Sequence, residues 1–331
     1  LVTCLGCHCS SSITLGFPRE TEMEKSKILI IGATGRIGYH LTKASLDSSH
    51  PTFALVRESA FSDPIKSQKL QSLSDSGATI LKGSLQEEAS LVEAVKQVDV
   101  VICAVSSKQV LDQKLLIQVI KQVGSIKRFI PSEFGSDPDK VRLSVLDAGY
   151  NFYKDKAEIR RLVEVEGIPY TYISCNFFMS LLIPSLLQPG LKVPPRDKVT
   201  IFGDGNTKAV FVKESDVAAF TINALDDPRT SCKVLYLRPP GNVYSFHEVI
   251  DLWEAKIGKK LEKSYVLEEE LLKDIKGTTF PDNFEKLFIY SAFILGDHTY
   301  FDIDSRSGVE GTELYPHVKY TTISEFLDTL V

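Results

Sequence analysis

The sequence predicts an α/β protein built on a doubly wound parallel sheet, followed by a smaller region of mixed α and β structure. Short apolar strands alternate with amphipathic helices from residue 27 onward, and a glycine-rich turn separates the first strand from the first helix. The alternation fades after Pro184, where prolines mark a long loop. The chain has 331 residues, of which 43% are apolar, so it can bury a core without disulfides or metals.

The first five strands follow a strand–helix repeat, which favours parallel pairing because parallel neighbours need a helical crossover. The first strand, 28–31, is entirely apolar, as expected of a strand covered on both faces. The other strands of the repeat are expected at 52–56, 79–81, 98–103 and 128–130, and its helices at 36–46, 65–73, 88–97 and 110–123. After the repeat we expect a helix at 155–166, a sixth strand at 170–173, and helices near 215–224, 245–257 and 268–275.

The chain divides into three predicted parts. Residues 1–22 show no sustained helix or strand period, so we interpret them as a non-native or disordered extension ahead of a natural start at Met23. Residues 23–175 are assigned to the first domain, and 176–331 to a second region that returns in part to the sheet. The motif Cys4-Leu-Gly-Cys7-His8 matches a haem-attachment pattern, but nothing downstream suggests a haem domain, and we treat the match as chance.

Composition argues against several classes of function. The 38 basic and 43 acidic residues give a net charge of -5, which offers no electrostatic basis for binding nucleic acid or an anionic membrane. No apolar stretch reaches the roughly 18 residues that a spanning helix needs. Cys103, Cys175 and Cys232 lie scattered in apolar runs, which suits a reducing compartment, and we expect the cytoplasm. The six histidines show no ligand spacing, so no metal is expected.

The strongest motif is a glycine-rich turn between the first strand and the first helix. Gly32 permits a tight turn, Gly35 leaves room for a pyrophosphate to approach the amides that open the helix, and Gly38 allows close helix–strand packing. This G-x-x-G-x-x-G spacing, placed in an alternating fold, predicts a Rossmann-type NAD(P)-binding domain. The first candidate cofactor-binding residues are therefore Gly32, Ala33, Thr34, Gly35, Arg36, Ile37 and Gly38.

The end of the second strand favours NADPH over NADH. NAD enzymes usually carry an acid there for the ribose hydroxyls, whereas this strand ends in Arg57, which suits a 2′-phosphate; Arg36 and Lys66 are candidate helpers. Ligands of open α/β sheets bind at the carboxyl ends of the strands, so the segments after the fourth and fifth strands join the expected cofactor site. Their candidate residues are Ala104, Val105, Ser106, Ser132, Glu133 and Phe134.

Two interpretations compete for the catalytic base. Tyr150-Asn-Phe-Tyr-Lys154 matches the Y-x-x-x-K pair of short-chain dehydrogenases, whose members share one face of a helix. The residues around Tyr150 favour a loop, however. The alternative is Lys156, one turn into the next helix, with Tyr153 three residues before it. A helical lysine is most often solvated, so a surface role for all of these residues also stays open.

Several blocks occur in an order that is specific to one family, among them Lys127-Arg-Phe-Ile-Pro-Ser-Glu-Phe-Gly135. The others are 27–35, 51–57, 166–172, 194–199, 203–206, 252–254 and 313–316. With these blocks the chain from Met23 to Val331 resembles the plant isoflavone reductase-like proteins, which are NmrA-like, atypical short-chain dehydrogenases. The family includes pinoresinol–lariciresinol, phenylcoumaran benzylic ether and isoflavone reductases, and the chain looks most like its pinoresinol–lariciresinol reductase members.

The resemblance implies an NADPH-dependent reductase of phenolic ethers of the phenylpropanoid or lignan type, with a homodimer as a further expectation. The family's catalytic lysine precedes Ile/Val-Arg-Arg, here Lys156-Ala-Glu-Ile-Arg-Arg161, so the role of general base falls on Lys156. Lys156 would accept a phenol proton, the phenolate would eject the para-benzylic ether oxygen, and hydride from NADPH would reduce the resulting quinone methide. Burial would lower the pKa of the lysine and make it a usable base near neutral pH.

Two departures from the family pattern put the substrate in doubt. Arg36 stands where the family usually has an aromatic residue, and Phe-Phe-Met-Ser-Leu-Leu at 177–182 replaces the usual Phe-Ala-x-Tyr-Phe. The expected pocket residues are Asn176, Phe177, Phe178, Met179 and Leu182, with Phe288, Ile289, Tyr290 and His298 as further candidates. Three alternatives stay open: a phenylcoumaran or isoflavone reductase, a reductase of a phenylpropenol ester, and a non-catalytic NADP-sensing regulator that would not need Lys156.

Overall fold

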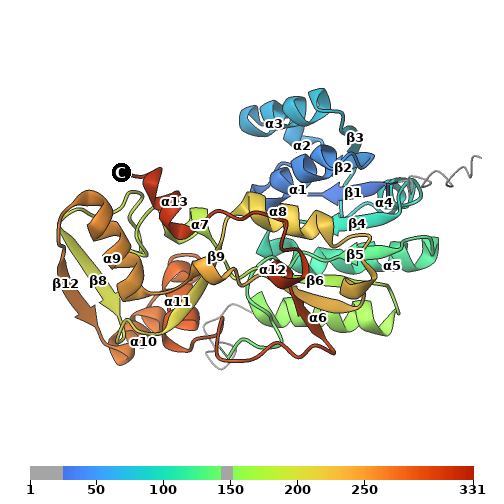
Figure 1. Cartoon of the computed structure of the whole chain (residues 1–331). Coiled ribbons are helices and arrows are strands. Elements are labelled where there is room, and N and C mark those ends of the chain that lie inside the picture. Colours follow the sequence, from blue (N-terminus) through green and yellow to red (C-terminus); the bar gives the residue numbers. More distant parts are fainter. Residues whose placement is uncertain (1–24, 143–151) are drawn as a thin grey trace, which may run out of the picture.

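The computed structural model describes residues 25–142 and 152–331 and shows two lobes side by side (Figure 1). The larger lobe holds a parallel sheet with helices on both faces. The smaller lobe holds two paired strands and the helices around them. Its elements are β8 (Lys198–Phe202), β12 (Glu262–Val266), α9 (Phe246–Ile257), α10 (Glu268–Gly277), α11 (Phe284–Ile289), η5 (Tyr290–Ile294, a π-helical turn) and α13 (Ile323–Asp328).

The sheet of the larger lobe has the order β3-β2-β1-β4-β5, and every neighbouring pair is parallel. Its strands are β1 (Ile28–Ile31), β2 (Thr52–Val56), β3 (Thr79–Lys82), β4 (Val100–Cys103) and β5 (Arg128–Ile130). A bridge between Phe129 and Tyr170 places a second parallel sheet next to β5. That sheet consists of β6 (Thr171–Ser174), β10 (Lys233–Tyr236) and β13 (Gly308–Glu310). The predicted fold class, a doubly wound parallel α/β sheet, is confirmed.

Both faces of the sheet are covered, which explains why β1 is apolar throughout. Ile28 and Ile30 pack into one apolar cluster, while Leu29 and Ile31 pack into the cluster on the opposite face. The first face is covered by α1 (Arg36–Asp47) and α8 (Glu214–Asn223), and the second by α4 (Glu88–Val95), α5 (Gln113–Val123) and α6 (Phe152–Val165). Shorter elements of this lobe are α2 (Ser59–Ser62), α3 (Pro64–Asp75), η1 (Ser107–Asp112), η3 (Pro228–Thr230), η4 (Pro240–Asn242) and α12 (Gly311–Leu314).

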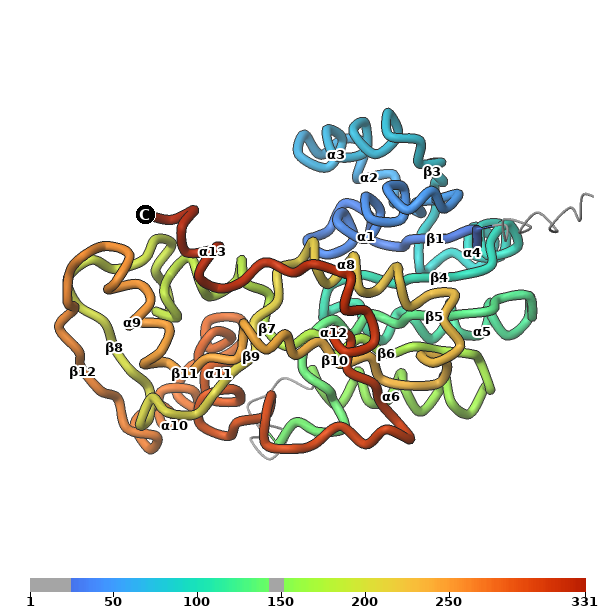
Figure 2. The backbone as a smooth tube through the Cα atoms, in the orientation of Figure 1, coloured from blue at the N-terminus to red at the C-terminus, as the bar shows by residue number. Residues whose placement is uncertain are grey.

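A third sheet lies between the two lobes and belongs to both of their cores. It consists of β7 (Phe177–Phe178), β9 (Lys208–Val212) and β11 (Val243–Ser245), and β7 leads directly into the single-turn helix α7 (Met179–Leu182). Val210 and Val212 of β9 pack into the core of the larger lobe, whereas Phe211 packs into that of the smaller lobe. Figure 2 shows the same position of β7 and β9 between the lobes.

The smaller lobe has its own apolar core around Trp253 of α9. The Trp253 indole is fully buried and donates a hydrogen bond from Nε1 to the carbonyl of Pro195. A capping box starts α9, because the Ser245 side chain accepts from the Glu248 amide while the Glu248 carboxylate accepts from the Ser245 amide. The helix α13, close to the C-terminus, packs back against α9 in this core.

Several boundaries and elements differ from the sequence-based expectations. The helix α6 begins at Phe152 rather than at 155, because Phe152 and Tyr153 pack against the core of the smaller lobe and extend the helix by about one turn. The expected helix at 110–123 starts as the 3-10 helix η1, and β4 begins at Val100 rather than at 98. The strands β7, β8, β9, β11 and β12 and the helix α11 were not predicted at all.

Candidate active site

The glycine-rich turn has the geometry that the sequence predicts. Gly32 has a φ of +91°, and a Cβ atom there would lie 2.3 Å from the carbonyl oxygen of Ala104. A Cβ atom on Gly38 would lie 2.1 Å from the carbonyl oxygen of Gly32, so helix and turn pack too closely for any larger residue. Gly35 precedes the first residue of α1, whose first-turn amides have no partners within the helix and suit a phosphate group.

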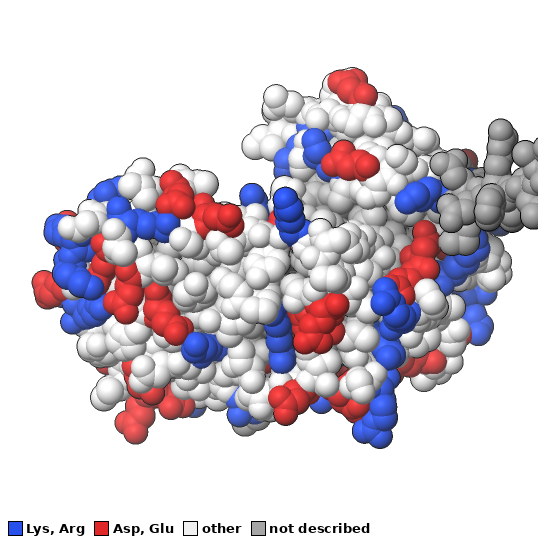
Figure 3. Space-filling view, in the orientation of Figure 1, with Lys and Arg blue, Asp and Glu red and all other residues white. Residues whose placement is uncertain are grey.

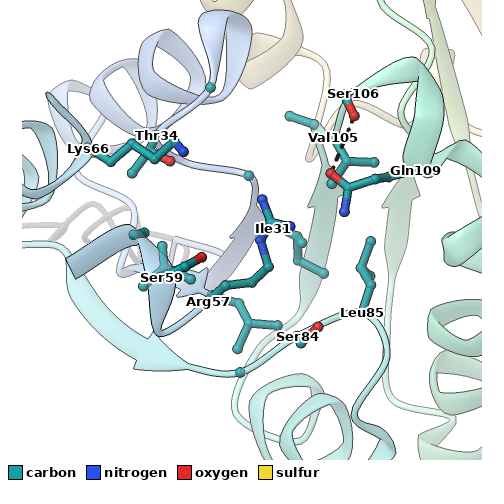
Figure 4. A pocket seen from close by; sticks show the side chains of 17 residues that line it. Ile31, Thr34, Arg57, Ser59, Lys66, Ser84, Leu85, Val105, Ser106 and Gln109 are labelled. Carbon is teal, nitrogen blue, oxygen red and sulfur yellow. Dashed lines mark hydrogen bonds between the residues drawn. The ribbon is translucent and has the colours of Figure 1, made fainter. Parts of the chain in front are cut away.

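A cavity of about 200 Å³ lies beside this turn and carries the predicted selectivity residue. Arg57 extends from the end of β2 into it, with Lys66 also on its wall (Figure 4). The neighbouring Glu58 is no substitute for the ribose-binding acid of NAD enzymes, because it pairs with Lys82 at 3.1 Å on the surface. Thr34, Ser59 and Ser84 add polar groups to the same wall. The arrangement fits a 2′-phosphate that receives charge from two basic side chains.

A second cavity, of about 410 Å³, continues from the first along the carboxyl edge of the sheet. The two cavities share Gly35, Ala104, Val105 and Ser106, which makes them one continuous groove. Its volume falls in the range of small-molecule sites. The predicted residues that line this second cavity are Arg36, Ile37, Ser132, Glu133, Phe134, Lys156, Asn176, Phe177, Phe178 and Phe288. Gly38 and Ala33 support the turn from beneath and line neither cavity.

Arg36 does not accompany Arg57 and Lys66, contrary to the sequence-based expectation of a helper at the 2′-phosphate. It lines the second cavity, and its Nη1 atom donates to the Ser180 hydroxyl at 2.8 Å. Ser180 donates in turn to the carboxylate of Glu214, the first residue of α8. The buried Glu214 carboxylate lies 3.9 Å from Nη1 of Arg36 and attracts the guanidinium, because α8 packs directly on α1.

Lys156 lies on the wall of the second cavity with only 3% of its surface exposed. Its Nζ atom donates to the main-chain carbonyl of Glu133 and lies 3.9 Å from the centre of the Phe152 ring. Burial lowers the pKa of Lys156 to about 8, although the nearby Glu133 carboxylate acts in the opposite direction. A sizeable fraction of the amine is therefore neutral at physiological pH, as a general base requires.

A buried ion pair supports Lys156 from behind. Arg160, four residues further along α6, donates from Nε and Nη2 to the two carboxylate oxygens of Glu133 at 2.7 and 2.6 Å. Its Nη1 atom reaches Asp137 at 2.7 Å, and the Tyr236 hydroxyl also donates to Asp137. The Glu133 carboxylate therefore turns away from the groove. The segment after β5 is held against α6 so that the Glu133 carbonyl faces Lys156.

The competing tyrosine–lysine pair has no support from the described residues. Tyr150 lies outside them, and Lys154 is exposed on α6. Tyr153, three residues before Lys156, is buried and lines the cavity. Its hydroxyl donates to the Ser136 hydroxyl at 3.5 Å, and burial raises the pKa of Tyr153.

The predicted pocket wall is only partly correct. Asn176, Phe177 and Phe178 line the second cavity, but Met179 and Leu182 do not and are buried in the core of the smaller lobe. These two residues are three apart and share the inward face of α7, which leaves Leu181 facing the groove. Phe288 lines the cavity as expected, joined by Phe284, whereas Ile289 and Tyr290 belong to the core.

Sequence reasoning missed Ser136 on the cavity wall and the role of Arg160 behind it. His298, a further pocket candidate, is buried and does not line the cavity itself, but it contacts Ser136, which does. Arg160 belongs to the motif that identified Lys156, so its spacing of four from the lysine was the available signal.

Within 25–142 and 152–331, no group of three or more His, Cys, Asp and Glu side chains is placed to hold a metal ion. No helix in these ranges has the length and apolar character needed to cross a membrane.

The fold and the groove define a dinucleotide-binding α/β protein with a buried lysine beside the binding cavity. A model described as the NmrA-like family matches residues 24–327, and the chain belongs to this family. "Probable pinoresinol-lariciresinol reductase 3" of Arabidopsis thaliana is 64% identical over 312 residues, which cover 94% of this chain and 100% of that protein. "Phenylcoumaran benzylic ether reductase IRL1" of Ginkgo biloba is 55% identical, covering 93% of this chain and 100% of that protein.

Solved structures agree with this assignment. A crystal structure of isoflavone reductase has a TM-score of 0.89 at 43% identity and covers 93% of this chain and 100% of its own. The structure of AtPrR2 with NADP+ and (+)pinoresinol has a TM-score of 0.87 at 37% identity, with coverage of 93% and 99%. The resemblance inferred from the sequence is confirmed.

Proposed function

We propose that this protein is an NADPH-dependent reductase of phenolic benzylic ethers, with a pinoresinol-type lignan as its substrate. The observation that carries the proposal is the buried Lys156, with a pKa of about 8, on the wall of a cavity continuous with the glycine-rich turn. The reductase names of its relatives and the pinoresinol-bound neighbour support the reaction class and the substrate.

The groove fits NADPH along its whole length. The first-turn amides of α1 suit the pyrophosphate, and Arg57 and Lys66 suit the 2′-phosphate. The segments that follow β4 and β5 line the cavity between the turn and Lys156, where they would hold the nicotinamide. When bound there, NADPH supplies a hydride to the benzylic carbon of the substrate. Structures solved with NADP+ or NADPH among the relatives support this assignment.

Lys156 acts first, as the base. Its neutral amine removes the proton from the phenol hydroxyl, and the phenolate then pushes electrons through the ring toward the para-benzylic carbon. The bond between that carbon and the ether oxygen breaks, and its electron pair leaves on the oxygen. The resulting quinone methide accepts the hydride, which restores the aromatic ring as a phenolate. One proton from Lys156 returns to the phenolate and one from water ends on the released oxygen.

Product analysis tests this proposal. The chain from Met23 is incubated with NADPH and, separately, with pinoresinol, a phenylcoumaran and an isoflavone, beside the Lys156→Ala variant. A ring-opened product that forms only with Lys156 present is expected from pinoresinol. Product from another member of the panel would reassign the substrate. NADPH binding without turnover of any compound would overturn the reductase proposal and favour the NADP-sensing regulator.

We further propose a cytoplasmic reductase that works as a homodimer. The buried free thiols of Cys103 and Cys175 support a reducing compartment. Lys, Arg, Asp and Glu are interspersed over the face seen in Figure 3, without one continuous basic area, which agrees with a small-molecule substrate rather than nucleic acid. The division of the chain near residue 175, and an extension over 1–22, stay predictions.

A further inference from the structure

A chain of hydrogen bonds leads from the main chain of β9 to the wall of the catalytic cavity. The Val210 amide donates to Nδ1 of His298 at 3.2 Å, and Nε2 of His298 lies 3.1 Å from the Ser136 hydroxyl oxygen. Ser136 lines the cavity together with Lys156. The His298 ring is held in place by the Phe177 ring, which meets it nearly perpendicularly with 4.5 Å between the centres.

The direction of these hydrogen bonds follows from which groups can donate. A backbone amide only donates, so Nδ1 of His298 must be the unprotonated nitrogen. Burial lowers the pKa of His298 to about 3, so the ring is neutral and its single proton is on Nε2. His298 therefore donates to Ser136, and the Tyr153 hydroxyl donates to the same Ser136 oxygen at 3.5 Å.

The Ser136 oxygen thus accepts from His298 and, at a longer distance, from Tyr153, which leaves its own hydroxyl proton free to point elsewhere. Among residues 25–142 and 152–331, no acceptor for this proton is found. Because Ser136 lies on the cavity wall, its O–H group is oriented as a donor toward whatever fills the cavity. Gly135 alone separates Ser136 from Phe134, within the same segment whose Glu133 carbonyl holds Lys156.

We propose that Ser136 is a catalytic residue that donates a hydrogen bond to the ether oxygen that leaves the benzylic carbon. This rests on the proposed function, since it assigns a group to one step of that reaction. His298 is then a positioning residue, because it acts by fixing the direction of the Ser136 hydroxyl. The two ends of the reaction are served by different groups, with Lys156 at the phenol and Ser136 at the leaving oxygen.

The donor matters because the leaving oxygen gains negative charge as the carbon–oxygen bond breaks. The electron pair of that bond moves onto the oxygen, the Ser136 proton stays on Ser136, and the released oxygen takes its proton from water. An aliphatic oxygen leaves as an alkoxide, which is a much stronger base than a phenolate. It therefore needs this stabilisation far more than a phenolic oxygen, whose conjugate acid has a pKa of about 10. A hydrogen bond aimed at developing charge typically contributes about 100-fold in rate.

The test compares two leaving groups in one protein. Pinoresinol releases an aliphatic oxygen, and a phenylcoumaran releases a phenolic one. Ser136→Ala is expected to lower kcat on pinoresinol by about 30- to 100-fold and on the phenylcoumaran by less than about 5-fold. Ser136→Thr, which keeps the hydroxyl, is expected to retain most of both rates. His298→Phe, which keeps the ring contact with Phe177, is expected to lower the ratio of the pinoresinol rate to the phenylcoumaran rate as well. The factor should be smaller than for Ser136→Ala.

The outcomes separate the two proposals. Equal slowing on both substrates, with unchanged NADPH affinity, would overturn the role of Ser136 while the reductase function stands. Turnover of neither substrate by the unmodified protein would overturn the reductase function and this role with it. If only one of the two substrates is reduced, the role of Ser136 is tested by the affinity of the ring-opened product for the complex of the protein with NADP+. A loss of about 5-fold or more in Ser136→Ala supports the hydrogen bond, and an unchanged affinity overturns it.

Discussion

The Nη1 atom of Arg36 lies 2.8 Å from the hydroxyl oxygen of Ser180, although 144 positions separate the two residues. One opens α1 and the other lies in α7, and Ser180 passes the contact on to the buried carboxylate of Glu214. Arg36 and the 177–182 segment are also the two places where the resemblance drawn from the sequence predicts a departure from the family pattern. A hydrogen bond therefore connects these two positions beside the second cavity.

Removing the side chain of Arg36 or of Ser180 should show that their contributions to the free energy of unfolding are coupled. Arg36→Ala leaves Glu214 without its cation, and Ser180→Ala removes the hydroxyl that joins the two, so we expect each to cost about 1 kcal/mol of unfolding free energy. Because the guanidinium is about half exposed, larger losses are not expected. The double variant should lose clearly less than the sum, measured by urea unfolding. Strict additivity would show that the three groups do not act together.

Cofactor preference should depend on Arg57 and not on Arg36. Arg57→Ala removes a charged donor at the 2′-phosphate and should weaken NADPH binding by about 10- to 100-fold while leaving NADH binding nearly unchanged. Arg36→Ala is the matched control, since its side chain lines the other cavity and pairs with Ser180. Dissociation constants for both nucleotides give the result. A loss of NADPH preference in the Arg36 variant would contradict the assignment.

The rate should rise with pH through the titration of Lys156. Only the neutral amine accepts the phenol proton, and burial lowers the pKa of Lys156 to about 8, so kcat/KM should increase from pH 6 and level off above about pH 9. The profile is recorded under NADPH saturation. Lys156→Ala should abolish turnover at every pH while it still binds NADPH. A flat profile between pH 6 and 9 would exclude this lysine as the titrating base.

Removing the charge of Glu133 or of Arg160, the buried ion pair beside Lys156, should shift this pH profile in opposite directions. Glu133→Gln removes a negative charge, so the pKa of Lys156 falls and the profile shifts to lower pH; Arg160→Gln removes a positive charge and shifts it to higher pH, each by about one unit. Arg160→Gln also leaves the buried carboxylates of Glu133 and Asp137 without their cation, at a cost of about 3 to 5 kcal/mol of unfolding free energy. Glu133→Gln should cost less, because Arg160 keeps Asp137 as a partner.

The exposed neighbour provides the control for that pair. Arg161→Gln alters a residue that binds Asp139 and Glu164 at the surface, and the pH profile should not move. Shifts of the Glu133 and Arg160 variants in the same direction would indicate a general disturbance of the site. Opposite shifts with an unmoved Arg161 variant would establish the electrostatic connection.

Two adjacent leucines should separate substrate contact from stability. Leu181 lines the cavity, so Leu181→Ala should change KM for the phenolic substrate with little effect on the melting temperature. Leu182 is 2% exposed in the core of the smaller lobe, so Leu182→Ala should cost about 2 to 5 kcal/mol of unfolding free energy. A KM effect confined to the Leu182 variant would contradict the observed direction of the two side chains.

The first half of the fold followed from the sequence because its signals are local. Each of these signals can be recognised within a window of about a dozen residues: the apolar run 28–31, the glycine turn and the amphipathic helices. The strands β8 and β12 carry no such signal, since they pair across about 60 intervening residues in a two-stranded sheet with exposed positions. Their existence depends on a partner far along the chain.

The sequence identified site residues correctly where the residue type alone determines the role. It failed where the role depends on the direction in which the side chain points. Lys156 and Arg57 were identified by type and place. Arg36 was misplaced because a long side chain at the end of a turn can reach either cavity, and Glu214 decides which. Met179 and Leu182 were misassigned because β7 passes into a single helical turn, where the alternation of a strand no longer tells which side faces the groove.

The sheet of β7, β9 and β11 contributes side chains to two cores at once, with Val210 and Val212 on one side and Phe211 on the other. Separating the lobes would therefore expose buried apolar side chains of both cores to solvent. Heat or denaturant should melt them together in one cooperative transition rather than one lobe at a time. We therefore expect the groove to keep its shape when a ligand enters, rather than to close by a hinge motion of two independent lobes.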